Sequence, residues 1–261
     1  IVVYGLLLNG GVEERASGSK GSVVLGSVEG CRLTVVVDNY GDSGIETAWG
    51  LSVFVETPSS RFLFDTGPDP GLLERNLRRL GIDAGSIDFV VISHEHGDHT
   101  GGLSYLARVK PGITVYVPKG TSGRIRAPNL SVVEVDNTTV VADGVAIIGW
   151  LNGPPAEQAL AINVRNRGLV IITGCGHPGV VNIAAKALRD LKVKPYLVLG
   201  GFHMEGAPSD ACRETVKRLL GLGVEKIAPI HCSGEQLRLI LMKEFPEHWL
   251  ECHVGSSIIL P

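Results

Sequence analysis

Short apolar runs recur along the whole chain, and most of them are four to six residues long. They are rich in β-branched side chains and are bounded by Gly, Pro or Asn, a pattern typical of strands. We therefore predict strands over Leu33–Val37, Leu51–Glu56, Phe62–Asp65, Phe89–Ser93, Ile113–Val117, Ser131–Val135, Val145–Ile148, Ala159–Val164, Leu169–Thr173, Tyr196–Leu199 and Lys226–Ile230.

Apolar positions at helical spacing appear between the later strands. Three such faces are formed by Ile183, Ala187, Leu188 and Leu191, by Cys212, Val216, Leu219 and Leu220, and by Leu237, Ile240, Leu241 and Phe245. Strand-rich hairpins and helices thus alternate in two halves that meet near residue 150. The pattern predicts an α/β (α+β) protein with two sheets that carry helices on their outer faces.

The composition indicates a globular protein and limits the partners that can be expected. The 261 residues are 44% hydrophobic and 20% charged, as in a globular chain that buries a large core. The net charge of −3 gives no reason to expect nucleic acid or an anionic membrane as partner, and it leaves a small molecule as the expected ligand. No apolar run is long enough to span a bilayer, and oligomeric state is left open.

The N-terminal residues differ from the rest of the chain. Ile1 to Leu8 is apolar but too short for a membrane span, and residues 9–30 hold six glycines and four serines. We expect residues 1–30 to be a mobile, turn-rich stretch and residues 31–261 to form a single domain. The five cysteines form no CxxC pair and their number is odd, which argues against a disulfide framework and for a reducing cytoplasm.

Four metal-ligating side chains lie within six positions directly after the expected strand at 89–93. In this run His94 and His96 can converge on one cation, while Asp98 and His99 turn toward a second. Nitrogen and oxygen donors suit zinc, and also manganese or iron. The chain has eight histidines, so three within six positions are improbable for an ordinary surface loop. The run predicts a site for two divalent metal ions.

Three more histidines follow expected strands in glycine-rich turns. His177 comes after the strand at 169–173, His203 after 196–199 and His231 after 226–230. Any one of them alone would be a structural residue more often than a functional one. Because ligand sites lie at strand ends in sheets of this kind, their shared position favours a role in the same site.

The run His94, His96, Asp98 and His99 resembles the HxHxDH motif of the metallo-β-lactamase superfamily. The upstream Phe64-Asp65-Thr66-Gly67 is similar to the Asp-Thr-Gly turn of that family, in which the aspartate supports a metal ligand. The resemblance covers about residues 33 to 235. It implies a four-layer αββα sandwich with the metals in a groove at one edge of the sheets.

The three later histidine turns resemble one subgroup of this superfamily. They are Gly174-Cys175-Gly176-His177, Gly200-Gly201-Phe202-His203 and His231-Cys232-Ser233-Gly234. The subgroup is often named for dihydropterin–ribofuranosylaminobenzene 5′-phosphate synthase, a condensing activity.

Two departures from the broader family affect the expected ligands. The chain has no histidine between His99 and His177, so His177 takes the place of the usual third imidazole. Cys175 stands where the bridging aspartate is expected. It could bind zinc as a thiolate, or it could be a small buried residue that leaves room for substrate.

The resemblance implies a role for each of these residues. His94, His96 and His177 would hold one metal, and Asp98, His99 and His231 the other, with Cys175 as a candidate ligand. His203 would be the general acid, Asp98 a further catalytic residue, and Asn39 and Phe202 candidate substrate contacts.

Three functions are compatible with such a site. A hydrolase that uses a metal-activated water on a phosphoester or related small molecule is the first expectation. The condensing, pterin-binding synthase is the alternative, since Phe202, Trp49 and Trp150 could stack on a flat ring. The third is a metal- or pterin-binding protein without turnover.

Overall fold

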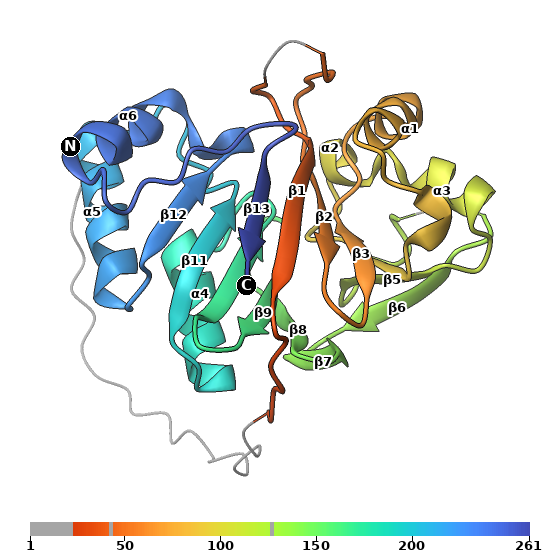
Figure 1. Ribbon diagram of the computed structural model, residues 1–261, viewed down its shortest axis with the longest axis horizontal. Coiled ribbons are helices and arrows are strands. Elements are labelled where there is room, and N and C mark those ends of the chain that lie inside the picture. Colours follow the sequence, from red (N-terminus) through yellow and green to blue (C-terminus); the bar gives the residue numbers. More distant parts are fainter. Residues whose placement is uncertain (1–22, 42–43, 126–127) are drawn as a thin grey trace, which may run out of the picture.

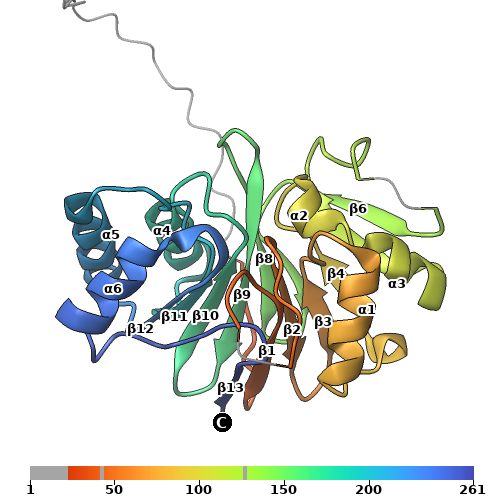
Figure 2. The ribbon, with the colours of Figure 1, turned by 90° about the horizontal axis from the view of Figure 1, so that it is seen from above.

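The computed structural model describes residues 23–41, 44–125 and 128–261, which form a four-layer sandwich of two sheets between two layers of helices (Figures 1 and 2). The seven-stranded sheet has the order β13-β1-β2-β3-β4-β5-β6, and the six-stranded sheet has the order β12-β11-β10-β9-β8-β7. The expected αββα architecture is therefore confirmed.

The strands of the first sheet are β1 (Cys31–Val37), β2 (Ser52–Glu56), β3 (Arg61–Phe64), β4 (Phe89–Val91), β5 (Thr114–Pro118), β6 (Ser131–Val135) and β13 (Ser257–Leu260). Those of the second sheet are β7 (Thr139–Ala142), β8 (Val145–Leu151), β9 (Glu157–Val164), β10 (Gly168–Thr173), β11 (Pro195–Gly200) and β12 (Lys226–Pro229).

The helices separate cleanly between the two outer layers (Figure 2). On the outer side of the first sheet lie α1 (Pro70–Arg79), α2 (Gly97–Thr100) and α3 (Leu103–Val109). On the outer side of the second lie α4 (Val180–Leu191), α5 (Ser209–Gly221) and α6 (Glu235–Glu244). Two 3₁₀ turns, η1 (Ala84–Ser86) and η2 (His231–Ser233), complete the helical elements of the described residues.

Three apolar cores hold the layers together. The central core fills the space between the sheets and includes the stacked rings of Phe62 and Phe89, whose centroids lie 4.6 Å apart. A second core packs α4, α5 and α6 on their sheet, and a third packs α1 and α3 on theirs. Near-complete burial on both faces explains why these strands are continuous apolar runs and not alternating ones.

Parallel pairing brings the histidine turns to one edge of the sandwich. β4 runs parallel to β3 and β5, and β11 runs parallel to both β10 and β12. The carboxyl ends of parallel strands meet at the same edge, which is where such sheets bind ligands. The turns after β4, β10, β11 and β12 therefore face each other across the two sheets.

The structure differs from the predicted two halves in two ways, and it contains elements that were not predicted. The change from one sheet to the other lies at residues 136–138, between β6 and β7, not near residue 150. The strand β13 then returns to the first sheet beside β1, so the halves are not strictly sequential. The strands β7 and β13 and the helix α1 were not predicted.

The expected mobile stretch lies mostly outside the described residues, which begin at residue 23. Within the described part, Val28 is buried and bridges to Val164. Among the described residues, no helix is long and apolar enough to cross a membrane.

Candidate metal centre

The six expected metal ligands meet where the two sheets present their strand ends. His94 lies after β4 and His96, Asp98 and His99 surround the start of α2, all on the first sheet. His177 precedes α4 and His231 opens η2, both on the second sheet. Their donor atoms form two groups, His94 with His96 and His177, and Asp98 with His99 and His231, and within each group the atoms lie within 4.8 Å of one another.

The first group consists of three imidazoles. The Nε2 of His94 lies 3.1 Å from the Nδ1 of His96, and the ring centroid of His177 lies 4.7 Å from that of His94. His94 is fully buried, whereas His96 is exposed at the mouth of the site. Three nitrogen donors that converge on one point suit a zinc-like cation.

The second group combines a carboxylate with two imidazoles and a thiol. The Oδ2 of Asp98 lies 3.6 Å from the Nε2 of His99 and 3.4 Å from the Nε2 of His231. The Sγ of Cys175 lies 3.2 Å and 3.4 Å from the same two nitrogens. Cys175 thus lies between the two sides of this group, at 5% exposure.

A buried carboxylate fixes His99 and the end of β4. Asp65 accepts hydrogen bonds through Oδ1 from the Ser93 amide at 2.7 Å, and through Oδ2 from the Ser93 hydroxyl and the His99 Nδ1, both at 2.7 Å. The Ser93 hydroxyl donates to Asp65, so it accepts from the Nδ1 of His94 at 2.9 Å. The expected supporting role of Asp65 fits this geometry, because both imidazoles turn their Nε2 atoms toward the centre.

Glu157, which the sequence analysis did not single out, supports His177 in the same way. Its Oε2 accepts from the backbone amide of His177 at 2.9 Å and lies 3.0 Å from the Nδ1 of the same residue. Its Oε1 accepts from the amides of Gly174, Cys175 and Gly176. One fully buried carboxylate therefore shapes the whole turn that carries His177 and Cys175.

Asn39 contacts His231, one of the expected ligands, through both polar atoms of its side chain. Its Oδ1 lies 3.1 Å from the Nδ1 of His231, and its Nδ2 donates to the His231 carbonyl at 3.0 Å. The Oδ1 of Asp38 accepts a further hydrogen bond from the His231 amide at 2.8 Å. Asn39 thus orients His231, and its contact with a substrate stays a prediction.

The electrostatics favour deprotonated ligands. Burial lowers the pKa of His94, and the neighbouring imidazoles lower it further. Burial also lowers the pKa of His96 and His231. Burial alone would raise the pKa of Asp98, but the hydrogen bond to His231 and the charges of His99 and His231 bring it to about 2. These groups can therefore bind a cation at neutral pH without first losing a proton.

The pKa values of His99 and Cys175 shift in the direction that favours their protonated forms. Burial alone would lower the pKa of His99, but the charge of Asp65 and its hydrogen bond raise it. The neighbouring Cys232 thiol and burial raise the pKa of Cys175. In the absence of a cation, Cys175 is therefore a neutral thiol at pH 7.

The aromatic residues and His203 lie around this centre in different ways. Phe202 is only 3% exposed and packs in the core beneath α4 and α5, and it also lines a small cavity beside His177 and His203, so its contact with a substrate stays a prediction. Trp49 is 52% exposed, and its ring centroid lies 5.0 Å from that of His231. His203 is exposed, with its ring centroid 4.6 Å from that of His177. A substrate at the centre could therefore contact Trp49 on the side of His231 and His203 on the side of His177.

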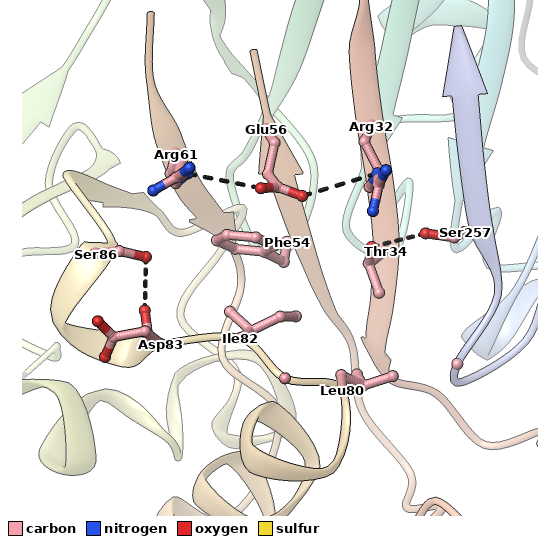
Figure 3. A pocket seen from close by; sticks show the side chains of 12 residues that line it. Arg32, Thr34, Phe54, Glu56, Arg61, Leu80, Ile82, Asp83, Ser86 and Ser257 are labelled. Atoms are coloured by element: carbon pink, nitrogen blue, oxygen red, sulfur yellow. Dashed lines mark hydrogen bonds and ion pairs between the residues drawn. The ribbon is translucent and has the colours of Figure 1, made fainter. Parts of the chain in front are cut away.

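A larger hollow elsewhere carries no comparable chemistry. A cavity of about 430 Å³ lies over the first sheet, lined by Arg32, Glu56 and Arg61 among others (Figure 3). Glu56 lies 4.0 Å from Arg32 and 3.6 Å from Arg61, so the charges there largely satisfy each other. Arg32 lies near the start of β1 whereas Asn39 follows its end, which places this cavity away from the histidines.

Comparisons with known proteins find similarity to the β-lactamase superfamily. A family model described as a β-lactamase superfamily domain matches residues 60–163. A relative from Methanocaldococcus jannaschii, named 7,8-dihydropterin-6-methyl-4-(β-D-ribofuranosyl)-aminobenzene-5′-phosphate synthase, is 27% identical, over 90% of this chain and 98% of its own.

Solved structures share the architecture. Tm1679, described as a metal-dependent hydrolase of the β-lactamase superfamily, has a TM-score of 0.74 and 28% identity, covering 87% of this chain and 98% of its own. A diphosphatase from the PhnP family has a TM-score of 0.61 with 17% identity, covering 88% of this chain and 97% of its own, and it supports the fold alone.

Proposed function

We propose that this chain, which is similar to the β-lactamase superfamily and to a dihydropterin-linked synthase, is a hydrolase with two metal ions that acts on a small phosphoester. The first metal would be held by His94, His96 and His177. The second would be held by Asp98, His99 and His231, with Cys175 as a fourth ligand. Zinc is the cation that this donor set suits best, with manganese or iron as alternatives.

The observation that carries the proposal is the way in which the outer partners orient the ligand histidines. The Nδ1 atoms of His94, His99, His177 and His231 each lie 2.7–3.1 Å from an oxygen of Ser93, Asp65, Glu157 and Asn39 respectively. Metal-ligating imidazoles are held by such a partner on the nitrogen that does not bind the metal. The four Nε2 atoms are left for ligation, which a merely structural histidine cluster would not require.

The protein's own groups have separate tasks in this reaction. When bound, the two metal ions would supply Lewis-acid chemistry, making water nucleophilic at neutral pH and stabilising negative charge on the phosphoryl group. Asp98 lies at the edge of the second group, where its carboxylate can also accept a hydrogen bond from the attacking water. His203 would donate a proton from a ring nitrogen to the leaving oxygen, because its imidazole is exposed beside His177.

A condensing reaction is the second candidate. The relative named as a synthase matches nearly the whole of both chains. The half-exposed Trp49 beside His231 offers an aromatic face at the site, as a flat ring such as a pterin would need. In this reaction the same ligands would hold the metals against a phosphate-containing leaving group, and the second substrate would replace water.

The first experiment measures metal content per chain by mass spectrometry on protein purified without chelator. About two ions in the parent, a clear loss in His177→Ala and no loss in the control His248→Ala are expected, since His248 is outside the site and bonds the Glu225 carbonyl. One ion or none in the parent, unchanged in His177→Ala, would overturn the ligand assignment and favour a protein without turnover.

The second experiment tests turnover on a panel of phosphodiesters and phosphomonoesters, with and without added metal. We expect hydrolysis by the parent and a fall in kcat of roughly 10²- to 10⁴-fold in His203→Gln, with metal content retained. If the parent hydrolyses none of the panel but joins a pterin diphosphate to an aminobenzene ribose phosphate, the condensing function replaces the hydrolase.

A further inference from the structure

A small cavity lies directly behind His177 and His203. It has a volume of about 260 Å³, is open to solvent on one side, and is bordered by the turn before α4, the start of α4, the turn after β11 and one face of α5. His177 and His203 form the wall that it shares with the metal centre. The volume lies slightly below that of pockets that bury a whole drug-sized ligand. The cavity therefore suits one substituent of a substrate whose reacting group lies at the metal centre.

Two helices supply hydrogen-bond donors to this cavity. Arg218 and Thr215 line it from α5, and Asn182 lines it from α4, where its Nδ2 also donates to the Pro178 carbonyl at 2.7 Å. None of the described residues that line it is a carboxylate. The opposite wall is apolar and includes Val180, Val181 and Met204 among others. This combination favours an anionic group attached to a short organic body.

The charge of Arg218 is not used within the protein. The neighbouring Arg213, also on α5, is paired with Glu244 at 2.8 Å and Asp210 at 3.0 Å. Arg218, in contrast, has no ion-pair partner among the residues that the structure describes. A guanidinium fork without an acidic partner can bind a phosphate through two parallel hydrogen bonds.

The start of α4 adds to the same preference. This helix of 12 residues begins at Val180, and no side chain caps its first-turn amides. Gly179, Val180, Val181 and Asn182, at this end of the helix, line the cavity. Backbone amides at a helix N-terminus favour a phosphate group there. The helix end contributes to the site, and Arg218, Asn182 and Thr215 make the cavity selective.

We infer that this cavity binds a second, non-reacting phosphate of the substrate. The inference rests on the proposed function, because the reacting phosphoryl group would occupy the metal centre on the other side of His177 and His203. The substrate class is thus a phosphoester that carries an additional terminal phosphate. Arg218 is the residue that distinguishes this class from esters without the extra phosphate.

The test uses two substrates that differ in one group. They are a nucleoside 5′-(4-nitrophenyl) phosphate diester and the same diester with an added 3′-phosphate. We expect the parent to have a KM roughly tenfold lower for the phosphorylated diester, at similar kcat. Arg218→Gln should abolish this difference, Arg218→Lys should restore part of it, and the control Lys217→Gln, on the exposed face of α5, should retain it.

A preference for the phosphorylated diester that survives Arg218→Gln, or that the parent lacks, would overturn the inference. Because Arg218 is exposed, the variant should fold, and its circular dichroism spectrum and melting temperature check this.

A binding measurement separates this inference from the proposed function. Inorganic phosphate is titrated calorimetrically into the metal-loaded parent, Arg218→Gln and Lys217→Gln. An affinity that falls roughly tenfold in Arg218→Gln alone supports the cavity even if no ester is hydrolysed. In that outcome the hydrolase proposal fails while the phosphate site stands. Equal affinity in all three proteins would place the phosphate elsewhere and overturn the inference.

Discussion

Glu157 contacts His177 twice through the same oxygen, accepting a hydrogen bond from its backbone amide at 2.9 Å and lying 3.0 Å from its Nδ1. The position of this imidazole is therefore fixed in both its backbone and its ring. Because Glu157 begins β9 and His177 follows β10, the contact also ties the ligand turn to the neighbouring strand.

We expect Glu157→Gln to weaken the metal site formed by His94, His96 and His177. The glutamine would present an N–H group where the carboxylate now accepts bonds from Gly176 or His177. Outer partners of this kind are worth about 10- to 100-fold in metal affinity. The measurement is a competition between the protein and a chromogenic zinc chelator.

Glu214→Gln on the exposed surface of α5 is the matched control, and it should bind metal as the parent does. The unpaired donor should also lower the free energy of unfolding of Glu157→Gln by about 1–3 kcal/mol. Unchanged metal affinity in Glu157→Gln would mean that His177 needs no such support.

Metal binding should release a proton from Cys175. Its raised pKa keeps the thiol neutral at pH 7 before metal is added, whereas a metal-bound cysteine is a thiolate. The affinity of the parent should therefore rise with pH more steeply than that of Cys175→Ser, by about tenfold per pH unit. Calorimetry in buffers of different ionisation enthalpy counts the protons directly.

The difference in proton release between the parent and Cys175→Ser counts only the proton of the thiol, because any proton that His99 loses is released by both proteins. Cys212→Ser, at a buried cysteine outside the site, serves as the control and should match the parent. Equal proton release from the parent and Cys175→Ser would show that Cys175 is not a ligand but the small buried residue of the alternative interpretation.

Gly97, within the histidine run, and Gly101, just after it, should differ in how much stability an alanine substitution costs. A Cβ on Gly101 would lie 2.0 Å from the carbonyl oxygen of Pro68, so backbone must move, whereas a Cβ on Gly97 would meet nothing within 4 Å. We expect Gly101→Ala to lower the free energy of unfolding by at least about 2 kcal/mol, and Gly97→Ala by less than about 0.5 kcal/mol. Denaturant unfolding of both variants in the same metal state measures this, and equal stabilities would contradict the close approach.

Trp49 should contribute to ligand affinity and not to stability. Its side chain is half exposed beside His231, so Trp49→Ala removes little buried area. If a flat ring stacks there, its Kd should rise roughly tenfold in Trp49→Ala and much less in Trp49→Phe. Titration with a soluble pterin, followed by calorimetry, tests this.

Trp150 provides the comparison for that experiment, because its Nε1 donates to Asp136 and its ring is partly buried. Trp150→Phe should bind the pterin as the parent does. A loss of pterin affinity in Trp150→Phe but not in Trp49→Ala would mean that the pterin ring lies near Trp150 and not near Trp49.

Most of the strands, and the six side chains that the structure brings together, could be predicted from the sequence because both have local signals. Buried parallel strands are continuous apolar runs, and each candidate histidine follows such a run in a glycine-rich turn. The structure brings all six together, although metal ligation itself stays a prediction. The helix α1 could also have been predicted, since Asp69 caps it, Pro70 begins it and Arg78 and Arg79 end it.

Other features have no local signal. Glu157 is a single acidic residue at the start of a strand, and its importance arises only when β9 and β10 pair and the following turn folds over it. Asn39 likewise meets His231 across 192 positions of sequence. The cavity behind His203 depends on how α4 and α5 pack, which spacing along one chain does not reveal.

The division of the ligands between the two sheets has a consequence for unfolding. Each expected metal would bind residues from both sheets, His94 and His96 with His177, and Asp98 and His99 with His231. Separating the two sheets would then require the release of both ions. Chelation should therefore loosen the packing between the sheets before either sheet unfolds. The amides of β1 and β9 are hydrogen-bonded within their own sheets, so the first signal would come from side chains packed between the sheets, such as Phe62 and Phe89.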